Sequence, residues 1–194
     1  KEINHQYSKS LSYENKFRDY IKEYMSSSID YFSFLRPLYE IQIASLFSKF
    51  PQYFDDFRSC NVGQKEGIWC GKCAKCLFNF MILSPFLSLD VLIQIFGSNL
   101  FEKSQLINIA RKLWGEIGFK PFECIGEPSE VIAALMYFIE TNPKPPNYFF
   151  IQEFNKFISQ KKPNRTLSQL LGDWDSQHNL PDMFEKIIHD KIQH

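Results

Sequence analysis

A cluster of cysteines constrains the fold of this chain more than any other feature of its sequence. Four of the five cysteines follow the pattern Cys60-x9-Cys70-x2-Cys73-x2-Cys76. A Cys-x2-Cys turn aims two sulfurs at one point, and four thiolates are a common ligand set for tetrahedral zinc. Cysteines of secreted disulfide-bonded domains are normally spread along the chain, so this clustering indicates a reducing cytoplasm.

We therefore predict that the four cysteines form one structural zinc site. Four protein ligands leave no open position for water, so the metal would hold its loop and perform no chemistry. Lys72 and Lys75 lie between the ligands and Arg58 precedes them, and these cations would offset the negative charge of the thiolates. Disulfides and an iron–sulfur cluster remain alternatives, although a bacterial ferredoxin run would continue with a fourth cysteine and a proline.

Apolar residues recur at helical spacing along most of the 194 residues, which predicts a mainly α fold. Residues 29–34 are a possible short strand. We predict a helical domain over residues 1–141 with its zinc loop at 57–78. The run NPKPPN at 142–147 cannot be helical and is predicted to be a linker. Residues 148–194 would then form a helical appendage.

Several residues are typical of helix ends. Pro37 and Pro128 suit the first position of a helix, because proline lacks the N–H group that is unpaired there. Ser88 is a predicted N-cap, and Gly97 is predicted to end the helix that follows.

Charge and hydropathy exclude two classes of partner as the main role. Lys plus Arg total 22 and Asp plus Glu total 22, so the chain has none of the positive excess that is typical of nucleic-acid binders. No apolar run approaches the roughly 20 residues needed to span a bilayer.

A few polar residues are candidates for a site. Arg36 precedes a predicted helix, where an anion could contact its guanidinium and free N–H groups, and a surface pair with Glu40 is the alternative. Cys124 is either a small buried apolar residue or a thiol at a substrate site. Glu123 lies near a predicted helix start, where the helix dipole alone favours acids.

Five segments resemble the C-terminal half of UDP-N-acetylmuramoyl-L-alanyl-L-glutamate epimerases. They are NHQYSKS at 4–10, SFLRPLYEIQIA at 33–44, SCN at 59–61, WCGKCAKC at 69–76 and PFECIG at 121–126. The resemblance covers about residues 1–140. It implies a bacterial enzyme of peptidoglycan precursor synthesis. With ATP and magnesium, such an enzyme would invert the terminal L-glutamate of the nucleotide-linked muramyl dipeptide to D-glutamate.

The resemblance also implies roles for individual residues, while the proton-transfer base stays unassigned. Side chains that would bind the anionic substrate are His5, Lys9, Arg36 and Asn61. Candidates for a catalytic or supporting role are Arg36, Glu40, Glu123 and Cys124.

These epimerases in turn resemble the N-type ATP pyrophosphatases, whose fold is α/β and HUP-like. The phosphate loop of that superfamily, Ser-Gly-Gly-x-Asp-Ser, does not occur in this sequence. The resemblance therefore implies an ATP-binding N-terminal half or partner chain, without which this chain should be inactive. Two alternatives remain open: an enzyme like 7-cyano-7-deazaguanine synthase, which has a similar cysteine loop, and a non-enzymatic zinc module that docks a partner chain.

Overall fold

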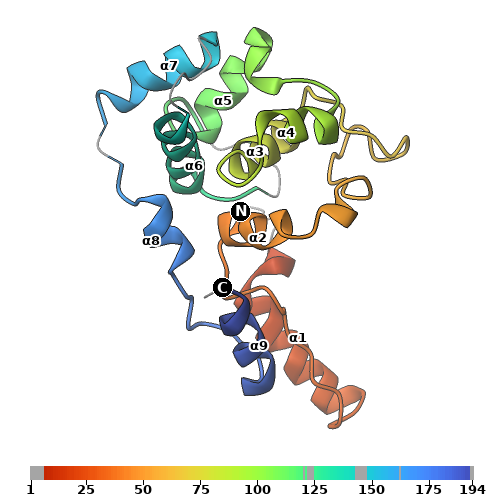
Figure 1. The fold of residues 1–194 in the computed structure, drawn as a ribbon. Coiled ribbons are helices and arrows are strands. Elements are labelled where there is room, and N and C mark those ends of the chain that lie inside the picture. The colour runs from red at the N-terminus through yellow and green to blue at the C-terminus, as the bar shows by residue number, and fades with distance from the viewer. Residues whose placement is uncertain (1–6, 120, 122–124, 143–147, 162, 193–194) are drawn as a thin grey trace. The chain divides into compact units, whose positions relative to one another are not determined.

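The structure is a computed structural model of the chain (Figure 1). It describes residues 7–119, 121, 125–142, 148–161 and 163–192. In these ranges the regular elements are α-helices and short 3-10 helices, and no strand occurs. The prediction of a mainly α fold is therefore confirmed.

The strand suggested at residues 29–34 is wrong, because this segment is irregular backbone followed by a turn. The segment is held by the side chain of Arg18 and pairs with no neighbouring strand among the described residues. Arg18 donates a hydrogen bond of 2.5 Å to the carbonyl of Tyr31 and forms an ion pair with Asp30.

The chain forms two compact units, which are described separately below. Unit 1 comprises residues 1–38 and 173–194, and unit 2 comprises residues 39–172. The predicted linker at 142–147 thus falls within the range of unit 2, and the predicted appendage at 148–194 is divided between the units.

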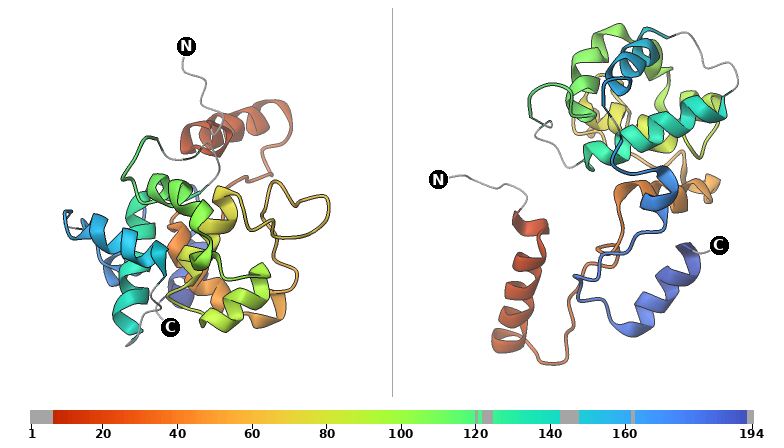
Figure 2. Two further views of the ribbon diagram at one scale, coloured as in Figure 1. Left: turned by 90° about the horizontal axis from the view of Figure 1, so that it is seen from above. Right: turned by 90° about the vertical axis from the view of Figure 1, so that its left-hand side faces the viewer.

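The described residues of unit 1 form two α-helices, α1 (Leu11–Tyr24) and α9 (Asp182–Ile192). Ser10 caps α1, because its hydroxyl accepts a hydrogen bond from the backbone N–H of Tyr13 at 3.1 Å. The irregular segment after α1 runs between the two helices in the right-hand view of Figure 2. There the ring of Phe184 on α9 contacts Phe32 and Phe34, with centroids 5.2 and 5.8 Å away.

Unit 2 contains the remaining α-helices of the described residues. They are α2 (Glu40–Ser48), α3 (Ala74–Leu83), α4 (Leu89–Phe96), α5 (Ile107–Leu113), α6 (Pro128–Thr141), α7 (Phe149–Ile158) and α8 (Leu167–Leu171). Ser88 caps α4, Gly97 ends it with φ of 75°, and Pro128 is the first residue of α6, as predicted.

Pro37 does not begin a helix, so that prediction is wrong. The N–H groups of Arg36 and Leu38 bond to the carbonyls of Ser33 and Leu35, which folds this stretch into tight turns. The helix begins three residues later, at Glu40.

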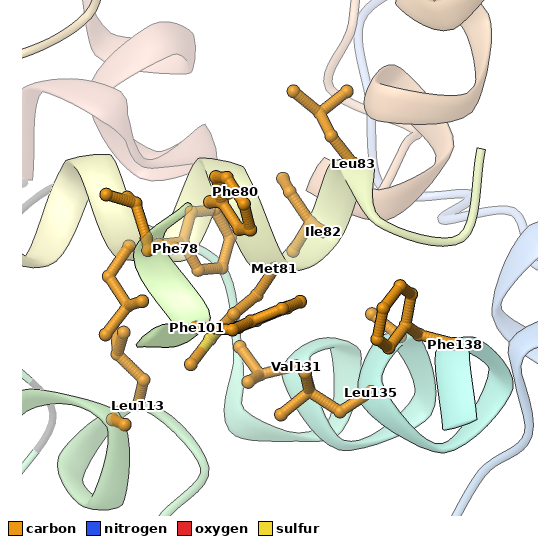
Figure 3. Close-up of a cluster of buried hydrophobic side chains, with 14 of the residues drawn as sticks. Phe78, Phe80, Met81, Ile82, Leu83, Phe101, Leu113, Val131, Leu135 and Phe138 are labelled. Carbon is orange, nitrogen blue, oxygen red and sulfur yellow. The ribbon is translucent and has the colours of Figure 1, made fainter. Parts of the chain in front are cut away.

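Helix α3 is the centre of the core of unit 2 (Figure 3). Phe80 and Met81 are fully buried, and α3 packs against α2, α4, α5 and α6. On α6, Leu135 and Phe138 face the α3 side chains in the close-up. A helix that is apolar on nearly all sides must be surrounded by other elements, and α3 has such neighbours on several sides.

Helix α7 belongs to the same core. The ring of Phe150 lies 5.2 Å from that of Phe101 and 5.5 Å from that of Trp114. Phe150 and Trp114 are 1% and 0% exposed. The aromatic core is therefore continuous from α3 to α7.

Candidate metal centre

The four cysteines of the predicted site come together in unit 2, where they could hold a metal ion. Their Sγ atoms all lie within 4.8 Å of one another. The separations are 3.8 Å for Cys60–Cys73, 3.7 Å for Cys70–Cys76 and 3.4 Å for Cys73–Cys76. A tetrahedron with metal–sulfur bonds of about 2.3 Å has edges of about 3.8 Å. The sulfurs are thus already spaced as a tetrahedral metal requires.

The backbone around the cluster aims the sulfurs inward. Gly71 has φ of 62°, a conformation that glycine adopts without strain, and it turns the chain between Cys70 and Cys73. A Cβ on Gly71 would also lie only 2.7 Å from Nζ of Lys103, which donates to the Gly71 carbonyl. Cys73 is the N-cap of α3, so the first turn of a buried helix fixes the last two ligands.

Backbone N–H groups point at two of the sulfurs. The N–H of Gly63 lies 3.2 Å from Sγ of Cys60, and that of Cys76 lies 3.5 Å from Sγ of Cys73. Such N–H groups stabilise thiolates, as does the N-terminus of a helix. The loop therefore stabilises negative charge on the sulfurs of Cys60 and Cys73, as a bound metal ion would.

The thiols titrate unequally because the sulfurs are so close. A hydrogen bond with the Cys76 thiol lowers the pKa of Cys73 to about 5, while the same contact raises the pKa of Cys76. Burial raises the pKa of Cys60, but backbone hydrogen bonds from Cys70 and Gly63 outweigh it, and the net shift is downward. At neutral pH the protein thus favours thiolate at Cys73.

The cations near the cluster also hold the loop together. The guanidinium of Arg58 donates to the carbonyls of Gly67, at 3.0 Å, and Phe57, at 2.6 Å. The ammonium group of Lys75 lies 3.3 Å from the side-chain oxygen of Asn61. Asn61, a predicted substrate ligand, is therefore an exposed residue that contacts α3 beside the cluster.

In unit 1, Arg36 and Lys9 lie together. The guanidinium of Arg36 bonds to the carboxylate of Glu14, at 2.9 Å from Nε and 2.8 Å from Nη2, and to the carbonyl of Lys9 at 3.1 Å. Glu14 is 2% exposed and also accepts from the amide of Asn179 at 2.9 Å. The carboxylate partner of Arg36 is thus Glu14, which the sequence analysis did not single out.

The remaining predicted site residues are Glu40, His5, Glu123 and Cys124. Glu40 is exposed at the first position of α2 in unit 2. His5, Glu123 and Cys124 lie outside the described residues.

Glu130 is a buried acid in the first turn of α6. Its carboxylate accepts from the N–H of Glu127 at 2.6 Å and from the N–H of Ile41 at 2.9 Å. It thereby joins the first turn of α6 to the first turn of α2. Burial raises the pKa of Glu130, although these two hydrogen bonds oppose the shift. A Cβ on Gly126 would collide with this carboxylate, so the PFECIG segment ends in a glycine that allows this approach.

Two family models match successive parts of the chain. Residues 56–169, which contain all four cysteines, match the MurL C-terminal domain, and residues 1–34 match the MurL N-terminal domain. The chain belongs to the MurL epimerase family. No solved structure gives a significant match.

Curated relatives in this family carry the name UDP-N-acetyl-alpha-D-muramoyl-L-alanyl-L-glutamate epimerase. The chain is 33% identical to that of Xanthomonas oryzae pv. oryzae over 187 residues, which cover 93% of this chain and 41% of the relative. It is 39% identical to that of a Micromonospora species over 143 residues, or 72% of this chain and 32% of the relative. The chain therefore spans less than half the length of these relatives.

None of the helices in the described part of the chain combines the length and hydropathy that a bilayer crossing requires. This agrees with the absence of a long apolar run in the sequence.

Proposed function

We propose that this chain is the C-terminal portion of an ATP-dependent epimerase. The enzyme would convert the terminal L-glutamate of UDP-N-acetylmuramoyl-L-alanyl-L-glutamate to D-glutamate in bacterial peptidoglycan precursor synthesis. The observation that carries this proposal is the match to both MurL domains along one chain, together with curated relatives that bear the name of this activity.

The metal of the cysteine cluster is proposed to be zinc in a purely structural role. All four donors are soft thiolates at tetrahedral spacing, and such closed four-thiolate sites are typical of structural zinc. Zinc would fix the loop of residues 57–78 onto the first turn of α3. Elemental analysis of the purified chain tests this, with about one zinc per chain expected. Iron, or two disulfides without metal, would contradict it.

The reaction needs an activated carboxylate. ATP would transfer its adenylyl group to the glutamate carboxylate and release pyrophosphate. Loss of the negative charge makes the α-proton more acidic, so that a base can remove it and an acid can return a proton on the opposite face. Hydrolysis of the adenylate would then free the D-glutamyl product. Among this chain's residues we propose Lys9, Arg36 and His5 for anionic substrate groups, with Asn61, Glu40, Glu123 and Cys124 as further candidates.

ATP and magnesium are proposed to bind mainly to an N-terminal half, on the same polypeptide or on a partner chain. We place that half in the HUP-like N-type ATP pyrophosphatase superfamily, on the sequence resemblance stated above. A nucleotide-linked substrate and a cluster of free thiols are both consistent with a cytoplasmic enzyme. An enzyme like 7-cyano-7-deazaguanine synthase is not favoured, since the named relatives are epimerases.

The test is an assay with the missing half supplied. This chain is combined with the N-terminal portion of the Xanthomonas oryzae relative and given the L-Glu dipeptide substrate in D2O with ATP and magnesium. We expect D-glutamate, identified by chiral chromatography after hydrolysis, with deuterium at its α-carbon. Omission of ATP is the control. Formation of a nitrile from a carboxydeazaguanine in place of epimerisation would contradict the proposal.

A further inference from the structure

Helix α1 carries a buried face and, beside it, an aromatic face that is only partly buried. The first contains Glu14 and Ile21, which are 2% and 4% exposed. The second contains Tyr13, Phe17, Tyr20 and Tyr24, here called the aromatic stripe. At 100° per residue, the two faces lie about a quarter of a turn apart. Within unit 1, Phe17 of the stripe also packs on the ring of Tyr31, with centroids 4.9 Å apart, and Tyr13 is half-buried. Unit 1 therefore leaves the C-terminal half of the stripe, Tyr20 and Tyr24, toward solvent.

The rings of the aromatic stripe form a continuous ladder. Neighbouring centroids are 5.9 Å apart for Tyr13–Phe17, 6.4 Å for Phe17–Tyr20 and 5.0 Å for Tyr20–Tyr24. The ring of Tyr7 extends the ladder at its start, 5.9 Å from Tyr13. The far end is the most open, since Tyr20 and Tyr24 are 52% and 66% exposed. A ladder of large rings this open is typical of a surface that binds another protein.

The exposed apolar residues of the chain concentrate in this region. Among the described residues, 18 large apolar side chains are exposed, and seven of them lie within residues 7–34. They are Tyr7, Tyr20, Tyr24, Met25, Ile29, Tyr31 and Phe34. Residues 1–34 are also the part of the chain that matches the MurL N-terminal domain. The open apolar surface and the N-terminal domain segment thus coincide.

We infer that the aromatic stripe of α1 is the surface against which the rest of a MurL N-terminal domain packs. In the Xanthomonas oryzae relative, this chain accounts for 41% of the length, so a large body of protein lies outside the matched region. Tyrosine suits such an interface, because its ring is apolar and its hydroxyl stays hydrogen-bonded at the rim. This inference rests on the proposed function, because it concerns the N-terminal half that the epimerase would need.

A cation lies at the N-terminal end of the stripe, beside Tyr7. Nζ of Lys16 lies 5.6 Å from the centre of the Tyr7 ring. A hydrogen bond with Lys16 also lowers the pKa of Tyr7. An interface with an apolar centre and charged rim is common for domains that associate specifically.

The experiment measures binding apart from catalysis. The chain is titrated with the N-terminal portion of the Xanthomonas oryzae relative by calorimetry, and hydroxyl-radical footprinting follows each tyrosine. We expect saturable binding and protection of Tyr20 and Tyr24. The double variant Tyr20→Ser/Tyr24→Ser should weaken binding by about 30-fold or more, the loss expected when interface hot spots are truncated.

A matched variant separates the stripe from tyrosines in general. Tyr53 and Tyr137 are 55% and 40% exposed in unit 2, and Tyr53→Ser/Tyr137→Ser should bind as the parent chain does. Circular dichroism checks that both variants fold. Equal binding by both double variants, or no binding by the parent chain, would overturn the inference. So would a self-association of the chain alone that the Tyr20→Ser/Tyr24→Ser change abolishes, because the stripe would then join two copies.

The outcome is distinguishable from failure of the proposed function. Binding through the stripe without epimerisation by the mixture would leave the inference standing and contradict the proposed activity. Epimerisation with unprotected stripe tyrosines would do the reverse.

Discussion

The two units of this chain close their apolar surfaces in different ways. Unit 2 surrounds α3 with helices, and its largest rings, Trp114, Phe80, Phe101 and Phe150, are at most 1% exposed. Unit 1 buries few apolar side chains, such as Ile21, Leu180 and Ile188, and leaves its aromatic stripe open. Burial of apolar area is the main stabilising contribution in folding. We therefore expect unit 2 to be stable by itself and unit 1 to gain stability from the partner proposed above.

The units also differ in how they use charge. Unit 1 holds an ion pair between the buried Glu14 and the half-buried Arg36, with Asn179 beside it. Unit 2 buries Glu130, which is held by backbone N–H groups, and gathers four thiols. Removing one partner of a buried pair is costly because the other is left unpaired. Each unit therefore depends on a different polar feature, so that substitutions at these features should lower the stability of one unit at a time.

The largest effect is expected from the metal cluster of unit 2. The variant Cys73→Ser removes a ligand, and structural zinc sites contribute on the order of 10 kcal/mol of folding free energy. We expect loss of bound zinc and of cooperative unfolding in unit 2. Calorimetric melting and elemental analysis measure both. Cys124→Ser is the matched control, since Cys124 is not one of the four clustered cysteines, and a wild-type melting temperature in a zinc-free Cys73→Ser protein would contradict the proposed role.

The next largest effect concerns whether α7 is integral to unit 2. Phe150→Ala removes a ring that contacts both Phe101 and Trp114, and a buried Phe→Ala change costs about 3–5 kcal/mol. Urea unfolding followed at Trp114 measures the loss. The control Phe149→Ala changes the neighbouring residue, which is 50% exposed, and should cost much less. Equal, small effects of both changes would show that α7 is a separate appendage.

Local features of the fold could be predicted from the sequence. Helix periodicity, the Ser88 cap, the Gly97 end and the Pro128 start each depend on a few neighbouring residues, and the structure confirms them. The four-cysteine cluster was equally accessible, because its ligand spacing is local. The start of α2 was misplaced since Pro37 also suits a turn, which is the role it has here.

Long-range partners could not be predicted in the same way. Glu14 and Arg36 are 22 positions apart, and Glu130 and Ile41 are 89 apart, so no periodic pattern links them. The grouping of α7 and α8 with unit 2, and of α9 with unit 1, likewise depends on tertiary packing. The Glu127–Glu130 spacing is the one signal that was available, because a capping box predicts that the second acid turns back toward the helix start.

The buried pair of unit 1 should give a smaller effect that is confined to that unit. Arg36→Ala leaves Glu14 buried without its cation, which is expected to cost about 3 kcal/mol. Each unit can be followed separately, because Trp174, stacked on His189 at 3.9 Å, is in unit 1 while Trp69 and Trp114 are in unit 2. In a chain labelled with 5-fluorotryptophan, the 19F signal of Trp174 should change at lower urea than in the parent.

The matched control for this change is Arg18→Ala in the same unit. Arg18 pairs with Asp30, which is 51% exposed, so its loss should cost at most about 1 kcal/mol. If Arg36→Ala shifts the Trp69 and Trp114 transitions as much as that of Trp174, the two units do not unfold independently and the comparison fails.

The smallest expected effect is a pH dependence of unit 2 that originates at Glu130. Burial raises the pKa of this carboxyl above its ordinary value of 4.5, with the charges of Glu40 and Glu127 adding to the shift. The folded unit thus favours the neutral acid. The corresponding stability is fully present below pH 4.5 and is lost as the pH rises through the raised pKa. Glu130→Gln cannot ionise and should lack this part of the pH dependence.

Urea unfolding, followed at Trp114 between about pH 4 and about pH 8, tests this point. This range covers the ordinary pKa of a glutamate and the higher values that a buried one can reach. The stability of the parent relative to Glu130→Gln should fall as the pH rises across that window. Glu127→Gln, at an exposed acid of the same capping box, should keep most of the pH slope of the parent, because its charge is the smallest contribution to the raised pKa of Glu130. An unchanged slope in Glu130→Gln would mean that the pKa of this carboxyl is not raised on folding, because the N–H groups of Glu127 and Ile41 offset the effect of its burial. The link between α6 and α2 would then be an anion site fixed by backbone donors.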